Sequence, residues 1–162
     1  MKTIVQMPDP VLRLVAPAVP VAAISSKHIQ SVIAAMKTAI EGEEDAVAIA
    51  APQLGESLRI FVVSKKVNKK FDEDLVFINP EIIRFGKQKK AMQEGCLSVR
   101  WKYGDVRRAT TASVRALNEK GHEFVMDGRG LLAQIFQHEV DHLNGILFID
   151  TAKNVEDLPP QK

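Results

Sequence analysis

Residues 131–145 read LLAQIFQHEVDHLNG, and the rest of the fold is expected to be built around this stretch. Four of its residues recur at the three- and four-residue intervals that place side chains on one face of an α-helix: Leu131, Ile135, His138 and His142. The pattern predicts a helix over residues 131–144, ended by Gly145, because glycine suits the left-handed turn that follows many helices. The apolar face of this helix should therefore continue into two histidines.

His138, Glu139 and His142 form the motif H-E-x-x-H on the predicted helix. Two imidazoles four residues apart can chelate one divalent cation, and the glutamate between them can reach a water on that cation. A tetrahedral catalytic site takes three protein ligands and keeps one position open, so a third ligand is needed. The extended H-E-x-x-H-x-x-G-x-x-H pattern is excluded, because Phe148 stands where its third histidine would be.

The third ligand is expected upstream, since few acidic residues follow the motif. The candidates are His28, His122 and Cys96. His28 opens a predicted surface helix and His122 lies in a predicted hairpin turn, so both are expected to face solvent. Cys96 lies beside a glycine in QEGCLSV, where backbone can approach closely, and a thiolate is a good ligand for zinc or iron. Residue chemistry leaves a second role for Cys96 open, that of a nucleophile with a histidine base.

Further segments indicate how the rest of the chain folds. Apolar spacing predicts an amphipathic helix over Ser25–Glu41, with Ser25 or Ser26 as its N-cap and Gly42 as its end. Short β-branched and aromatic runs predict strands over residues 58–63, 75–78, 81–85, 111–117 and 123–126. Asn79-Pro80 should form a turn or bulge, and residues 118–121 the loop of a hairpin.

This order of elements predicts a compact single-domain α+β fold, with strands and short antiparallel sheets around a central H-E-x-x-H helix. One catalytic domain should span residues 1–162. The tail from about residue 151 is expected to be frayed.

Composition narrows the functional classes. Of the 162 residues 46% are hydrophobic and 26% charged, as in an ordinary globular protein, and the net charge is only +2. Cations gather over residues 65–108 without interleaved aromatic residues, which favours a solvated face and no direct nucleic-acid readout.

The single cysteine excludes an internal disulfide and suits a reducing cytoplasm. Pro8 and Pro10 interrupt any signal-peptide pattern, and no apolar run is long enough to span a membrane.

Three segments in order carry a resemblance to a known family, the peptide deformylases. AVAIAAPQ at residues 46–53 resembles the family's first motif, EGCLS at residues 94–98 matches its second, and QHEVDH at residues 137–142 matches its third. A weaker likeness extends over nearly the whole chain, from MPDPVLR to GILFID. Three motifs in the right order and spacing are far more specific than H-E-x-x-H alone.

The resemblance implies an enzyme that removes the N-formyl group from the initiator methionine of new polypeptides and releases formate. It implies that Cys96, His138 and His142 hold one divalent metal, Fe²⁺ in the cell, with Zn²⁺, Ni²⁺ or Co²⁺ as alternatives. Glu139 would act as general base and then general acid. The Gln53 side chain and the Leu97 backbone N–H would stabilise the oxyanion. We expect a cytoplasmic monomer of bacterial type, organelles included, with transient ribosome association at most.

Substrate binding is expected from residues near the motifs. The resemblance places Ala46, Val47, Ala48 and Glu94 beside the peptide. An apolar slot for methionine would be lined by Leu131 and Ile135, with Met92 as a further candidate. The alternative for these apolar residues is simple core packing.

The chain departs from the family pattern at three places. Ala46 and Ala48 stand where glycine is usual, which adds two methyl groups beside the substrate. Arg100 stands where proline is common and alters the peptide-binding edge. Leu158-Pro159-Pro160 does not resemble the long basic helix that some relatives use at the ribosome, so docking by that route is not expected.

Two other functions fit the same residues. A small metallopeptidase would use the same H-E-x-x-H chemistry on internal peptide bonds. A non-catalytic deformylase-like binding protein would keep the metal for stability while Ala46 and Ala48 close the groove. Against the second function, Gln53, Glu94 and Glu139 are all present, and a purely structural metal site does not require them.

Overall fold

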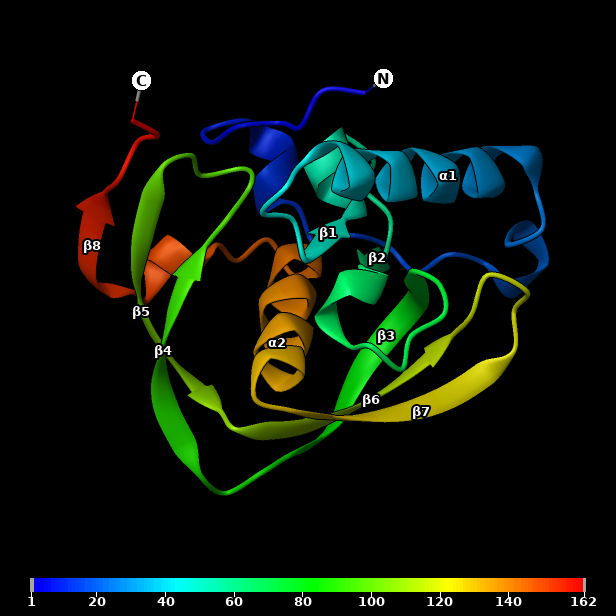
Figure 1. Ribbon diagram of the computed structural model, residues 1–162. Coiled ribbons are helices and arrows are strands. Elements are labelled where there is room, and N and C mark those ends of the chain that lie inside the picture. Colours follow the sequence, from blue (N-terminus) through cyan, green and yellow to red (C-terminus); the bar gives the residue numbers. More distant parts are fainter. Residues whose placement is uncertain (1, 162) are drawn as a thin grey trace.

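The computed structural model describes residues 2–161. Within this range two α-helices, α1 (Lys27–Gly42) and α2 (Leu131–Leu143), pack with two antiparallel sheets (Figure 1). The five-stranded sheet has the order β1 (Ala48–Ala50), β2 (Ile60–Val63), β3 (Leu75–Phe85), β6 (Thr111–Leu117), β7 (Glu123–Arg129). The three-stranded sheet has the order β4 (Lys89–Gly95), β5 (Lys102–Ala109), β8 (Lys153–Asp157). The predicted compact α+β fold with antiparallel sheets is confirmed.

Strand β2 shows how the five-stranded sheet separates two apolar layers. Its residues are all buried, and side chains alternate between the faces of a strand. Ile60 and Val62 pack in the cluster that contains the apolar face of α1, whereas Phe61 and Val63 pack in the cluster that contains α2. A helix therefore covers each face, which is why the strand reads as a continuous apolar run.

Helix α2 contacts strands of both sheets. It packs against β1, β2, β3, β6 and β7 of the larger sheet and against β5 of the smaller one (Figure 1). Gly128 on β7 permits this close approach, since a Cβ at that position would lie 2.7 Å from Cε2 of Phe136. The helix ends as expected, because Gly145 follows it with a φ of +73°.

The β3 region differs in one respect from the two strands expected there. Asn79-Pro80 forms a bulge inside one strand, with a register shift between Ile78 and Glu81. Asn79 has a φ of +51°, and its side chain accepts from the Val19 N–H at 2.8 Å and donates to the Val19 carbonyl at 2.9 Å. These two hydrogen bonds hold the bulge against the N-terminal segment.

The tail, expected to fray from about residue 151, contains strand β8 in the structure. β8 pairs with β5, and Lys102 Nζ lies 2.8 Å from Asp157 Oδ1. Every residue of β8 is exposed, so its sequence carries no alternation that would have revealed a strand. Over the described chain neither α1 nor α2 is long and apolar enough to cross a bilayer.

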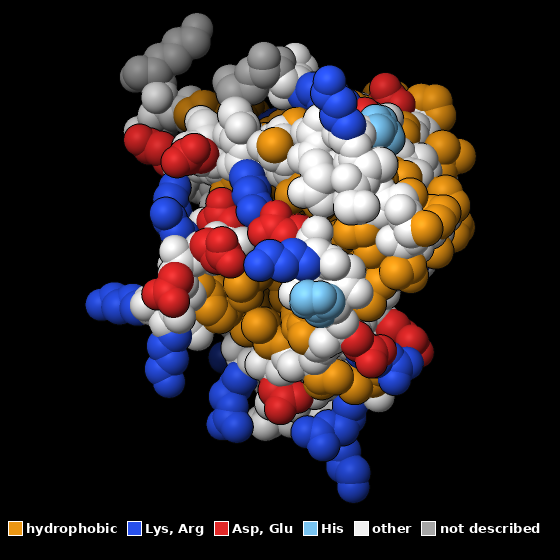
Figure 2. All heavy atoms as spheres, turned by 90° about the vertical axis from the view of Figure 1, so that its right-hand side faces the viewer, with side chains coloured by type: hydrophobic (Ala, Val, Ile, Leu, Met, Phe, Trp, Pro, Cys, Tyr) orange, Lys and Arg blue, Asp and Glu red, His pale blue; other side chains and the backbone are white. Residues whose placement is uncertain are grey.

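One face of the molecule carries side chains of both charges. On the face shown in Figure 2, acidic and basic side chains are interspersed and do not form a patch of one sign.

Candidate metal centre and active site

The two motif histidines and the lone cysteine converge. His138 and His142 lie one turn apart on α2, and Cys96 lies just after β4. Their candidate ligand atoms all lie within 4.8 Å of one another, and Cys96 Sγ is 3.3 Å from His142 Nε2. Of the three candidates for the third ligand, the structure places Cys96 here. His28 has a 65% exposed side chain on α1, and His122 is exposed beside the hairpin turn.

The donor set fits a first-row metal ion. One thiolate and two imidazoles suit zinc, iron and their neighbours. His138 Nδ1 lies 2.8 Å from Glu94 Oε1, which leaves its other ring nitrogen for an ion. Among the described residues, two buried polar atoms without a protein partner, Glu139 Oε2 and His142 Nδ1, belong to this motif. Buried polar atoms are nearly always paired, so Glu139 Oε2 indicates room for a polar group that is not protein.

Glu94 links the cluster to a buried ion-pair network. Arg108 Nε donates to Glu94 Oε2 at 2.7 Å, and Arg108 Nη1 donates to Asp141 Oδ2 at 2.7 Å. Burial raises the pKa of Glu94, but the hydrogen bonds from Arg108 and His138 outweigh burial and lower the pKa to about 2. Glu94 therefore stays a carboxylate and can fix the orientation of the His138 ring.

The titratable residues of α2 sit in contrasting environments. Burial raises the pKa of Glu139 to about 7. Burial lowers the pKa of His142 well below its ordinary value, which favours the neutral ring that binds metals. Burial also lowers the pKa of His138, but hydrogen bonds with Cys96 and Glu94 outweigh it and raise that pKa. A ligating imidazole must be unprotonated, so a metal ion at His138 would compete with its proton.

Gln53 is buried, and its amide is oriented by hydrogen bonds. Its Oε1 accepts from the Ala50 N–H at 2.9 Å. Its Nε2 donates to Ser98 Oγ at 3.1 Å and lies 3.6 Å from Cys96 Sγ. The 3₁₀ turn over Ala51–Leu54 places this side chain beside the cluster, so Gln53 is not an exposed loop amide. Leu97, the residue after Cys96, is also buried and lines the same cavity.

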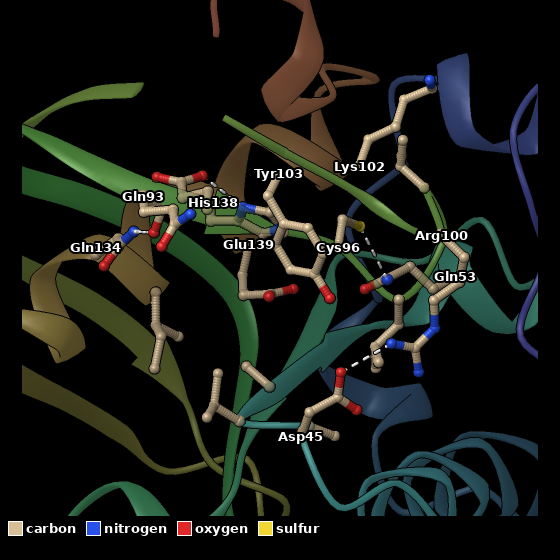
Figure 3. A pocket seen from close by; sticks show the side chains of 18 of the residues that line it. Asp45, Gln53, Gln93, Cys96, Arg100, Lys102, Tyr103, Gln134, His138 and Glu139 are labelled. Atoms are coloured by element: carbon tan, nitrogen blue, oxygen red, sulfur yellow. Dashed lines mark hydrogen bonds and ion pairs between the residues drawn. The ribbon is translucent and has the colours of Figure 1, made fainter. Parts of the chain in front are cut away.

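The cluster opens into a cavity of about 290 Å³. Figure 3 shows His138, Glu139, Cys96 and Gln53 around it. Its walls include all but one of the substrate-binding residues expected from the sequence: Ala46, Val47, Ala48, Glu94, Leu131 and Ile135. Met92 is the exception, since it lies half-buried on β4 opposite Val106 and is not among the lining residues. Neither Ala46 nor Ala48 has a positive φ, so their methyl groups occupy space without straining the backbone.

Sequence reasoning missed several residues that line the cavity. These are Gln93, Trp101, Lys102, Tyr103 and Gln134; Arg100, which was expected at the peptide-binding edge, lines the cavity as well. The Tyr103 ring packs on Gly95, where a Cβ would lie 2.5 Å from Tyr103 Cε1. Pairing of β4 with β5 sets this contact, and neither strand was expected from the sequence. In the sequence, the motif G-C-L-S at residues 95–98 was the one sign that the segment before Tyr103 lies near the site.

Comparisons with known proteins agree with the geometry. Residues 1–157 match the sequence model of the family described as polypeptide deformylase. A peptide deformylase of Halothermothrix orenii is 45% identical over 142 residues, covering 88% of this chain and 87% of that protein.

Solved structures of peptide deformylases are also similar to this chain over most of its length. A peptide deformylase from Legionella pneumophila matches with a TM-score of 0.86 and 38% identity, over 95% of this chain and 87% of that one. A Met-Ala-Ser-bound class I type b peptide deformylase from Acinetobacter baumannii matches with a TM-score of 0.83 and 34% identity, over 93% and 99% of the two chains. Because the family model spans nearly the whole sequence and these relatives align over most of both partners, the chain belongs to the polypeptide deformylase family.

Proposed function

We propose that this protein is a metal-dependent hydrolase that removes the N-formyl group from the initiator methionine of new polypeptides and releases formate. The observation that carries the proposal is the Cys96, His138 and His142 cluster, which borders a cavity that also contains Glu139 and Gln53. Membership of the deformylase family supports the same activity. In this proposal α2 is the central catalytic helix, and residues 1–162 form one catalytic domain.

Cys96, His138 and His142 would hold the metal. A bound divalent cation supplies Lewis-acid polarisation and lowers the pKa of a coordinated water. Fe²⁺ is the proposed ion in the cell, with Zn²⁺, Ni²⁺ or Co²⁺ able to replace it, because a thiolate and two imidazoles suit all four.

Glu139 would move the proton. It takes a proton from the water that attacks the formyl carbon and delivers it to the amine nitrogen as the carbon–nitrogen bond breaks. Burial raises the pKa of Glu139, which is the direction that suits a group that must accept a proton and then donate it near neutral pH. Formate and the free methionine amine are the products.

Gln53 and Leu97 would stabilise the negative charge on the formyl oxygen. The buried amide of Gln53 has one N–H engaged by Ser98 and its carbonyl held by Ala50, so it is fixed before substrate arrives. Fixed donors of this kind cost no reorganisation during the reaction. The Leu97 backbone N–H is the proposed second donor.

The peptide would enter with its methionine side chain against Val47, Leu131 and Ile135. The Acinetobacter baumannii relative binds Met-Ala-Ser, which supports a peptide ligand of this kind. We propose that the protein acts as a monomer in the cytoplasm, where new chains emerge, with no more than transient contact with the ribosome.

The test is formate release from a formyl-Met-Ala-Ser peptide by protein prepared without oxygen and loaded with iron(II). Wild type should release formate, and Glu139→Ala should keep its metal but lose roughly 10²- to 10⁴-fold in turnover. An internally cleavable peptide without a formyl group is the matched substrate control. Cleavage of that peptide alone would defeat the proposal, and equal rates for both proteins would remove Glu139 from its role.

A further inference from the structure

Arg100 joins the two sides of the cavity. Its Nη1 lies 2.8 Å from Asp45 Oδ2 and its Nη2 lies 3.0 Å from Glu43 Oε2. Asp45 and Glu43 belong to the segment between α1 and β1, whereas Arg100 belongs to the segment between β4 and β5. We call Arg100, Glu43 and Asp45 the strap, and Figure 3 shows the Arg100–Asp45 part of it.

The arginine of the strap is more buried and has more partners than the arginine of a typical surface ion pair. The Arg100 side chain is only 18% exposed, although its carboxylate partners are 42% and 54% exposed. The guanidinium carbon lies 4.4 Å from the centroid of the Trp101 ring, and the Arg100 N–H donates to Gln6 Oε1 at 3.4 Å. A guanidinium held by two carboxylates and a ring loses little further freedom when a substrate binds.

Two residues of the strap, Asp45 and Arg100, belong to the polar lining of the cavity. Val47, Leu131 and Ile135 are apolar lining residues that suit contact with a methionine side chain. Asp45, Arg100, Lys102 and Tyr103 are polar lining residues. We call the region around the paired Asp45 and Arg100 the polar part, and in Figure 3 Arg100 and Gln134 lie on opposite sides of His138 and Cys96. The backbone that follows methionine carries N–H and C=O groups that need polar partners, so this backbone should run toward the polar part.

We propose that Arg100 is a specificity-determining residue. It fixes the distance between the two cavity walls that contact the peptide after its methionine. This inference rests on the proposed deformylase function. Arg100 does not touch the reacting atoms in this proposal. It acts by holding the segment over residues 43–48 against the segment over residues 96–101.

The first test compares two substrates, formyl-methionine amide and formyl-Met-Ala-Ser. In Arg100→Ala the ratio of the KM for formyl-Met-Ala-Ser to the KM for formyl-methionine amide should rise about fivefold. This is the size of effect expected when two partly exposed ion pairs are lost. The rise in KM should exceed any fall in kcat. Arg100→Lys keeps the charge but lacks the planar fork, so its KM for the longer peptide should be intermediate.

Arg115→Ala is the matched control, because Arg115 also pairs with two carboxylates, at 2.9 Å to Glu81 and 3.7 Å to Glu123, and does not line the cavity. It should leave the ratio of the two KM values unchanged. Equal KM changes for both substrates in Arg100→Ala, or no change for either, would overturn the proposal for the strap alone.

A second measurement does not depend on turnover. Hydrogen exchange of the amides over residues 43–50 should be faster in Arg100→Ala than in wild type, because the strap restrains that segment. Unchanged exchange would overturn the proposal. Should wild type release no formate from either substrate, the proposed function fails, and the exchange result still decides whether the strap holds the wall.

Discussion

Glu94 is the residue on which the geometry of the metal centre depends most. Its oxygens accept from Arg108 at 2.7 and 2.8 Å, and Oε1 also lies 2.8 Å from His138 Nδ1. A buried carboxylate with a lowered pKa thus neutralises a buried arginine and orients a candidate ligand at once. The family motif marks Glu94 in the sequence, but Arg108 is identified only when β4 and β5 pair.

Glu94→Gln should weaken both stability and metal binding. The neutral amide leaves Arg108 with a single carboxylate partner, Asp141, and such losses in buried ion pairs cost about 3 kcal/mol. Loss of the partner of a ligating histidine typically weakens metal binding 10- to 100-fold. Urea unfolding with a chelator present measures the first effect and a metal competition assay the second. Glu81→Gln, in an exposed pair with Arg115, is the control and should change stability by less than about 1 kcal/mol.

Ser98 is a fully buried residue that sequence reasoning did not select. Ser98→Ala should lower kcat about 3- to 10-fold, because the Gln53 amide loses the hydrogen bond that orients it. Ser98→Thr keeps a hydroxyl and should recover part of the rate. Single-turnover kinetics with formyl-Met-Ala-Ser measures the step directly. A loss of stability with no change in kcat would mean that Ser98 is only a packing residue.

The elements differ in how well the sequence reveals them. The helices over residues 25–41 and 131–144 appear as α1 and α2 within two residues, since each carries a periodic apolar face. The predicted hairpin appears as β6 and β7, although β7 continues to Arg129, three residues beyond the expected end. By contrast β4 consists of KKAMQEG, has one buried residue, and presents no alternation to detect. β4, β5 and β8 depend on pairing between distant segments, which one-dimensional periodicity does not contain.

The end of α2 offers a test at the scale of an element. A Cβ on Gly145 would lie 2.5 Å from the Arg13 carbonyl oxygen, and its φ is +73°. Gly145→Ala should therefore cost about 3 kcal/mol, from the left-handed backbone together with a clash against main chain. Gly121 has a similar φ of +83° but its nearest neighbour would be 3.8 Å away, so Gly121→Ala should cost only about 1 kcal/mol. Equal losses of stability for Gly145→Ala and Gly121→Ala in thermal or urea unfolding would contradict the predicted clash at residue 145.

At the scale of the whole molecule, the N-terminal segment is fastened to the segment that follows α2. Arg13 donates to both oxygens of Asp150, at 2.6 and 2.9 Å, and also to the Gly145 carbonyl at 3.3 Å. The buried cluster of Leu12, Val99, Val106, Leu147 and Phe148 lies in the same part of the molecule and joins four separate stretches of the chain. Contacts between such distant stretches could not be derived from the sequence.

Stability should depend on pH through Asp150. The hydrogen bond from Arg13 lowers the pKa of Asp150, so its contribution is present above the ordinary aspartate pKa and is lost as the pH falls through the lowered value. Asp150→Asn should reduce stability at pH 7 by no more than about 1 kcal/mol, because the pair is partly exposed. The difference from wild type should shrink toward zero in acid. Urea unfolding across the pH range checks this, and an equal difference at all pH values would contradict it.

Cys96 is the chain's sole cysteine, and it lies in the candidate metal cluster. A thiol-selective reagent such as a maleimide therefore has one target, and a coordinated sulfur reacts far more slowly than a free one. The fraction of protein that resists alkylation then gives the fraction that carries metal. A mass spectrum of the alkylated sample would thus report the loading of each preparation before any assay is run.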